Sequence, residues 1–101
     1  IKAELCLHEA ITMAHNYGMK ILLTPYVESR EYRDKKWRLS EEVWSEIVLK
    51  WAKFAEENDV EMFAPGVEMN LILEENVVGE WFKIILPKIR EVYSGKVITA
   101  E

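Results

Sequence analysis

The sequence lacks the features that mark several broad classes of protein. Among its 101 residues there is a single cysteine, so no disulfide can form within the chain. No apolar run extends beyond a few residues, which excludes a membrane-spanning helix in this sequence. Acidic residues outnumber lysine and arginine, giving a formal net charge of −5. This balance argues against a general nucleic-acid-binding surface.

A targeting signal is also missing from this stretch of sequence. The sequence starts at Ile1, without an initiator methionine, and its first residues are predicted to be helical. Such a start is typical of a trimmed or excised segment. With no signal and no membrane span, the cytoplasm is slightly favoured as the compartment. Cys6 lies among helical apolar residues, so we expect a buried, unreactive thiol.

Three amphipathic helices are predicted from apolar residues at three- and four-residue spacing. Gly18 is placed to close the first helix, and Ser40 is placed to cap the second. The apolar stripe of the first helix predicts one buried face. The expected helices span 2–17, 40–58 and 76–93, and the stripe consists of Leu7, Ala10, Ile11 and Ala14, widened by Cys6, Met13 and Tyr17.

Short apolar runs predict three buried strands, at 19–24, 60–64 and 96–100. The resulting order, α-β-α-β-α-β, repeats a unit of roughly forty residues, the size of one βα unit. Strands that are joined through helices run parallel. The predicted fold class is therefore α/β, a contiguous portion of a parallel (β/α) barrel.

Carboxylates follow the predicted strands at similar positions. Pro25 and Pro65 each come one step after a strand, and Glu28 and Glu68 each come three residues after the proline. Glu101 follows the third strand in a similar way. Because the strands are expected to be parallel, all three carboxylates are predicted to gather along one rim of the sheet.

Three parallel strands cannot close into a barrel, since an eight-stranded barrel takes about 250 residues. Two unpaired sheet edges and one apolar sheet face would remain bare. We therefore expect the chain to self-associate or to bind a complementary barrel segment.

Several stretches resemble (β/α)8 glycoside hydrolases of the retaining clan A, most closely the endo-mannanase and galactanase-like branches. Residues 14–25, Ala-His-Asn-Tyr-Gly-Met-Lys-Ile-Leu-Leu-Thr-Pro, are similar to the pattern A-H-x-x-G-M-x-V-x-L-x-P. Residues 60–68, Val-Glu-Met-Phe-Ala-Pro-Gly-Val-Glu, resemble the fourth strand, and residues 86–97 resemble the passage into the fifth. The resemblance implies the third to fifth strands of a barrel that hydrolyses a β-linked polysaccharide such as mannan or galactan.

By position, the resemblance implies that Glu68 is the general acid/base. This carboxyl group would protonate the glycosidic oxygen and later activate water. The nucleophile comes from the seventh strand of that family, outside this chain, so the chain alone is expected to be inactive. Val67 departs from the pattern, because the family has Asn or Thr there, and valine cannot hydrogen-bond a sugar.

Further residues are candidates for sugar binding. Trp37 and Tyr26 suit the apolar face of a pyranose ring, although Trp37 could instead pack the charged loop at 27–39 against the protein. Glu28 and Glu101 could contact the sugar or be ordinary surface acids.

Other interpretations of the chain stay open. It could be a non-catalytic α/β fragment or assembly module, in which Val67 marks lost activity. A small doubly wound domain is disfavoured, because no glycine-rich phosphate turn follows a strand. No cofactor is implied. His8 and His15 lack a third ligand type nearby, so we predict no metal site and expect His15 to pack or hydrogen-bond at its helix end.

Overall fold

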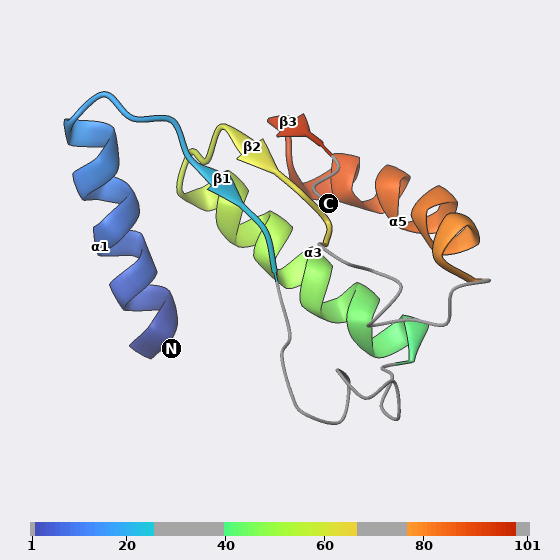
Figure 1. Cartoon of the computed structure of the whole chain (residues 1–101). Coiled ribbons are helices and arrows are strands. Elements are labelled where there is room, and N and C mark those ends of the chain that lie inside the picture. Colours follow the sequence, from blue (N-terminus) through green and yellow to red (C-terminus); the bar gives the residue numbers. More distant parts are fainter. Residues whose placement is uncertain (1, 26–39, 67–76, 99–101) are drawn as a thin grey trace, which may run out of the picture.

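The computed structural model describes residues 2–25, 40–66 and 77–98, and helices alternate with strands along these segments (Figure 1). This confirms the predicted order α-β-α-β-α-β. Each strand is shorter than the apolar run that predicted it, because only two residues of each run pair with a neighbouring strand. The elements are α1 (Lys2–Asn16), β1 (Leu22–Leu23), α3 (Glu41–Glu57), β2 (Met62–Phe63), α5 (Val78–Val92) and β3 (Lys96–Val97).

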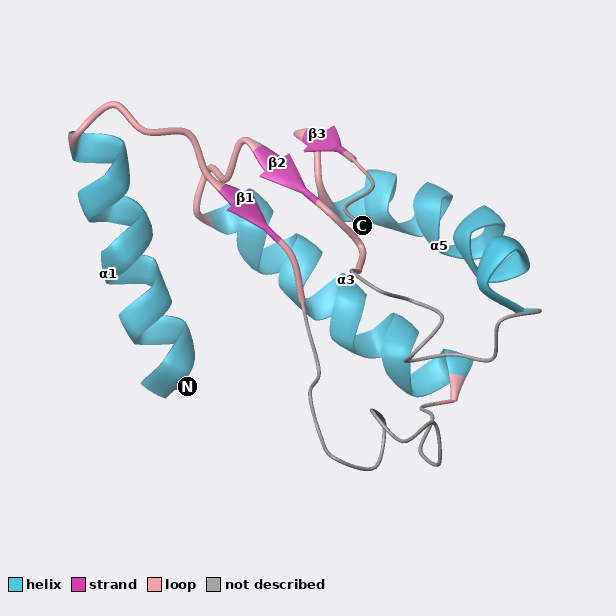
Figure 2. Ribbon diagram, viewed as in Figure 1, coloured by secondary structure: helices cyan, strands magenta, loops and turns pink. Residues whose placement is uncertain are grey.

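The three strands form one parallel sheet in the order β1-β2-β3, as predicted. Helices α3 and α5 cover one face of this sheet, and α1 stands beside β1 at one end of the layer (Figure 2). None of the helices in the described residues is long and apolar enough to cross a membrane. The register aligns Leu22 with Met62 and Lys96, and Leu23 with Phe63 and Val97.

Both predicted helix-end signals are confirmed. Gly18 adopts a φ of 75°, a left-handed conformation in which a side chain would be strained. Its N–H donates to the carbonyl of His15, and the Met19 N–H donates to that of Ala14, which closes α1 with a Schellman motif. At the start of α3, the Ser40 hydroxyl accepts from the Val43 N–H at 3.2 Å.

The core lies between the sheet and the α3–α5 pair. Trp44 of α3 and Trp81 of α5 are almost fully buried, while Trp51 is half-buried. The Phe63 ring of β2 packs against the Tyr93 ring at 5.8 Å between centroids. Burial on this scale supplies the main free energy of folding. The other buried apolar residues of this cluster are Ile11, Val48, Ala52, Phe54, Ala55, Val60, Ile85 and Ile89.

Helix α1 is covered less than its sequence predicts. Of its expected stripe, only Ile11 is buried, while Leu7 and Ala14 are half-buried. The prediction of a buried thiol is wrong, because Cys6 is exposed. Leu22 of β1 is also 43% exposed, so this strand is not buried on both faces. These residues are exposed because, among the described residues, no element lies on the outer side of α1 and no strand pairs with the outer edge of β1 (Figure 1). The remaining stripe residues, Ala10, Met13 and Tyr17, are exposed as well.

Candidate active site

The carboxyl ends of the three strands lie at one edge of the sheet, as parallel pairing requires. Thr24 and Pro25 follow β1, residues 64–66 follow β2, and Ile98 follows β3. Pro65 is fully buried, so the chain leaves β2 in a fixed position. In parallel α/β folds, ligands bind beyond this edge. We therefore take the carboxyl edge as the candidate active site.

All of the sequence-predicted site residues lie outside the described residues. They belong to the segments that leave the carboxyl edge after Pro25, Gly66 and Ile98. The convergence of three carboxylates on one rim accordingly stays a prediction. The residues concerned are Tyr26, Glu28, Trp37, Glu68 and Glu101, and Val67 lies outside the described residues too.

Thr24 is a polar residue at this edge that the sequence analysis did not single out. Its hydroxyl oxygen is buried and has no hydrogen-bond partner among the described residues. Because a buried hydroxyl costs free energy unless it is hydrogen-bonded, this oxygen is a group that a neighbour or a ligand at the strand ends would stabilise. The available sequence signal was a polar residue that ends an apolar run directly before a proline.

At the opposite, amino edge of the sheet, Glu61 ties α1 and β1 to β2. Its Oε1 accepts from the Ile21 N–H at 2.8 Å, and its Oε2 lies 2.9 Å from His15 Nε2. Both hydrogen bonds lower the pKa of the Glu61 carboxyl, and the bond from the Ile21 N–H has the larger effect. The expectation that His15 hydrogen-bonds at its helix end is confirmed.

A second set of contacts at the amino edge ties the end of α5 to α3 and β2. Glu56 Oε1 accepts from both the Ser94 N–H and the Ser94 hydroxyl at 2.9 Å, and this lowers the pKa of Glu56. The Tyr93 hydroxyl donates to the Val60 carbonyl at 2.7 Å, and burial raises the pKa of this phenol. The polar groups of this edge already bond to one another, which is typical of the stabilising face of βα barrels.

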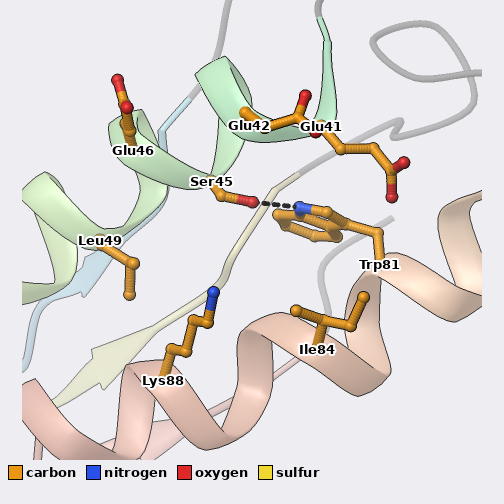
Figure 3. A pocket seen from close by; sticks show the side chains of 8 residues that line it. All are labelled: Glu41, Glu42, Ser45, Glu46, Leu49, Trp81, Ile84 and Lys88. Atoms are coloured by element: carbon orange, nitrogen blue, oxygen red, sulfur yellow. Dashed lines mark hydrogen bonds between the residues drawn. The ribbon is translucent and has the colours of Figure 1, made fainter.

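A cavity of about 390 Å³ lies between α3 and α5, away from the strand ends (Figure 3). Across it, the Trp81 Nε1–H donates to the Ser45 hydroxyl at 2.8 Å. No strand residue lines this cavity, so it is separate from the candidate site. Its lining consists of Glu41, Glu42, Ser45, Glu46, Leu49, Trp81, Ile84 and Lys88.

A metal centre is not formed within residues 2–25, 40–66 and 77–98. These residues contain no cluster of three or more His, Cys, Asp or Glu side chains able to hold an ion. His8 instead bonds to the side chain of Asn58, and His15 bonds to Glu61.

A family profile and three solved structures that match this chain all belong to one family of glycoside hydrolases. The profile of Glycoside Hydrolase Family 113 matches residues 2–101. Two solved structures described as a GH113 β-1,4-mannanase are similar, with 26% and 24% identity and TM-scores of 0.74 and 0.76. The GH113 β-mannanase AaManA from Alicyclobacillus acidocaldarius, in complex with ManMIm, has 20% identity and a TM-score of 0.73.

Each of the three alignments covers 93% of this chain but 34% of the matched chain. The chain thus spans about a third of the length of the solved structures that it matches, and its α/β fold is a partial barrel of the kind they contain. A search of curated protein sequences found no significant match.

Proposed function

The chain belongs to glycoside hydrolase family 113, and from this premise we propose that it forms part of an enzyme that hydrolyses β-1,4-linked mannan. The observation that carries the proposal is the family match over residues 2–101, nearly the whole chain. The solved structures with the same fold, described as β-mannanases, support the same substrate class. Because the chain spans about a third of those structures, the activity belongs to a complete barrel.

Glu68 is proposed as the general acid/base of that barrel. It follows Gly66 by two residues, so covalent geometry keeps it near the carboxyl end of β2. A carboxyl group at this position would protonate the leaving glycosidic oxygen and then, as the carboxylate, activate water. Retention of configuration also requires a second carboxylate about 5–5.5 Å away. That group would come from a strand outside this chain, so the chain alone is expected to be inactive.

The other predicted site residues are proposed to contact the sugar. Trp37 and Tyr26 would offer aromatic faces to a pyranose ring, and Glu28 and Glu101 would accept hydrogen bonds from its hydroxyl groups. These roles are supported by the positions of the residues in the sequence, within the segments that follow β1 and β3. No cofactor takes part in the proposed reaction.

A second candidate is a non-catalytic member of the family, and the observation that favours it is Val67. Valine stands beside Glu68 where related enzymes carry Asn or Thr, and it cannot hydrogen-bond a sugar or a carboxyl group. The two candidates differ in one measurable respect, which is whether Glu68 takes part in bond cleavage.

The test compares a complete barrel that contains this chain with its Glu68→Gln variant. The expected loss in kcat on β-mannan is about 10²–10⁴-fold, because glutamine cannot donate a proton. An aryl β-mannoside with an acidic phenol as leaving group should lose less in the glycosylation step, since that group departs without protonation. Glu74→Gln, an acid in the same stretch of sequence, is the matched control. Equal rates for the wild type and Glu68→Gln would remove Glu68 from the mechanism and favour the non-catalytic candidate.

A further inference from the structure

The cavity between α3 and α5, which we call the outer groove, opens on the side of these helices that faces away from the core (Figure 3). Its volume of about 390 Å³ lies in the range of small-molecule sites, which is about 300–1,000 Å³. On their other side, the same helices bury Val48 and Ile85 in the core. The outer groove is therefore large enough for a ligand, and the side chains that line it decide which ligand fits.

Helical spacing places the lining residues on the sides of two helices that pack against each other. Residues three and four positions apart are neighbours on a helix surface. One side of α3 therefore carries Glu42, Ser45, Glu46 and Leu49, and one side of α5 carries Trp81, Ile84 and Lys88. The outer groove is thus a preformed feature of the helix layer.

The floor of the outer groove is apolar. Leu49 is half-buried, and Ile84 is 53% exposed although it is a large hydrophobic residue. The Trp81 ring is almost fully buried, and its N–H already donates to the Ser45 hydroxyl. An alkyl chain in the groove would remove Leu49 and Ile84 from water, which is favourable.

The α3 wall of the outer groove carries negative charge that no ion pair neutralises. In the described part of the chain, Glu41, Glu42 and Glu46 have no such partner. Glu41 and Glu42 stand in the first turn of α3, where the helix dipole favours a carboxylate. Glu46 lies beyond that turn and four residues after Glu42, so these two like charges repel each other. A cation beside them would relieve the repulsion.

Lys88 is the one cation among the described residues that line the outer groove. It extends from α5 toward α3, and it forms no ion pair with another described residue (Figure 3). Three carboxylates against one ammonium group leave the lining negative. The described carboxylates form no cluster able to hold a metal ion, so this charge suits an organic cation.

We propose that the outer groove binds a free aliphatic amine. The ammonium group lies against the carboxylates of α3, the alkyl chain covers Leu49 and Ile84, and Lys88 competes with the ligand for the carboxylates. A lysine side chain of a partner protein has the same chemistry, and the experiment separates the two sources. No strand residue lines the groove, so the inference does not depend on the proposed hydrolysis of mannan.

The experiment titrates the chain with hexylamine and follows three groups by NMR, the methyl groups of Leu49 and Ile84 and the indole N–H of Trp81. Their resonances should shift and saturate together. Hexanol has the same alkyl chain without the charge, and it should bind about threefold more weakly because it forms no ion pair. Propylamine should bind more weakly than hexylamine, by up to about fourfold for each missing methylene group.

Substitutions in the wall of the groove test the role of charge. Glu42→Gln and Glu46→Gln should each weaken the binding of hexylamine about 1.5–5-fold, and Lys88→Met should strengthen it by a similar factor. Glu57→Gln is the matched control, because Glu57 is an exposed carboxylate of α3 that does not line the groove, and it should leave the affinity unchanged. All four residues are exposed, so the variants keep the fold.

Several results would overturn the proposal. These are the absence of saturable shifts, shifts confined to residues outside the lining, and equal affinities for hexylamine and hexanol. Unchanged affinity in Glu42→Gln, Glu46→Gln and Lys88→Met would overturn it as well. Lysine with blocked peptide ends should bind more weakly than hexylamine, because its polar peptide groups find no free partner on the apolar floor. Tighter binding of this lysine derivative would assign the groove to a partner protein instead of a free amine.

Discussion

Helix α1 and the α3–α5 pair are all amphipathic in sequence, α1 the least so, and they differ in their surroundings. Helices α3 and α5 each connect two strands of the sheet, and they bury Trp44, Val48, Trp81 and Ile85. Helix α1 precedes the first strand and buries only Ile11. Amphipathic spacing therefore predicts which side of a helix can be buried, whereas the strands on either side of the helix decide how much of it is.

The largest expected effect comes from making the same substitution in the two regions. Ile85 of α5 is 0% exposed and Ile11 of α1 is 3% exposed, so Ile85→Ala and Ile11→Ala each remove a buried side chain. We expect Ile85→Ala to lower the free energy of global unfolding by about 2–5 kcal/mol. Ile11→Ala should act mainly on the attachment of α1, raising amide hydrogen exchange in that helix.

Urea unfolding is followed by tryptophan fluorescence, to which Trp44 and Trp81 in the core between the sheet and the α3–α5 pair contribute. Hydrogen exchange is measured residue by residue. An equal loss of global stability in the two variants would contradict the comparison, because it would show that α1 unfolds together with α3 and α5.

A smaller effect on stability is expected at the amino edge of the sheet, in the turn after α5. A Cβ on Gly95 would clash with the Tyr93 hydroxyl oxygen, and the Tyr93 side chain cannot move aside because it is buried and its hydroxyl donates to the Val60 carbonyl. Gly95→Ala should therefore lower the free energy of unfolding by about 1–3 kcal/mol.

Gly79→Ala provides the control, because nothing lies within 4 Å of its added Cβ. Alanine at this helical position of α5 should raise stability by up to about 1 kcal/mol. Thermal melts of both variants measure the difference. An unchanged melting temperature for Gly95→Ala would show that the turn after α5 can shift to make room for the added methyl group.

The smallest effect concerns the attachment of α1 and depends on pH. The folded-state pKa of Glu61 is lowered, so its contribution to stability is present above the ordinary Glu pKa of about 4.3 and is lost as the pH falls through the folded-state value. The Glu61 side chain is 34% exposed, and solvent screening keeps this contribution small.

Glu61→Gln should accordingly be less stable than the wild type near neutral pH, and the difference should close in acid. Hydrogen exchange of α1, measured from neutral pH to well below the ordinary Glu pKa of about 4.3, follows this contribution directly. A difference between the two proteins that persists unchanged at the acid end would show that Glu61 does not act through its charge.

The sequence predicted the elements well because the signals for them are local. Apolar spacing placed the three helices, and Gly18 and Ser40 marked two of their ends through bonds to residues a few positions away. Parallel pairing followed from the helical connections alone. The burial of Cys6 was mispredicted because it depends on a neighbouring element that no local pattern describes.

The site was predicted only as far as a sheet edge, and its candidate side chains lie outside the described residues. The order of elements places the segments with Glu28, Glu68 and Glu101 after the carboxyl ends of the strands, but it does not fix the distances between their side chains. The role of Glu61 was not predicted either. Its partners Ile21 and His15 lie 40 and 46 residues away, and spacing along the chain carries no information on such contacts.

The strand order β1-β2-β3 follows the order of the sequence, so β2 pairs with β1 and β3 pairs with β2. During synthesis, every new strand therefore finds its template already made, and no later segment has to be threaded between two earlier ones. The sheet can grow in the direction of translation, one βα unit at a time, with each completed unit setting the register of the next.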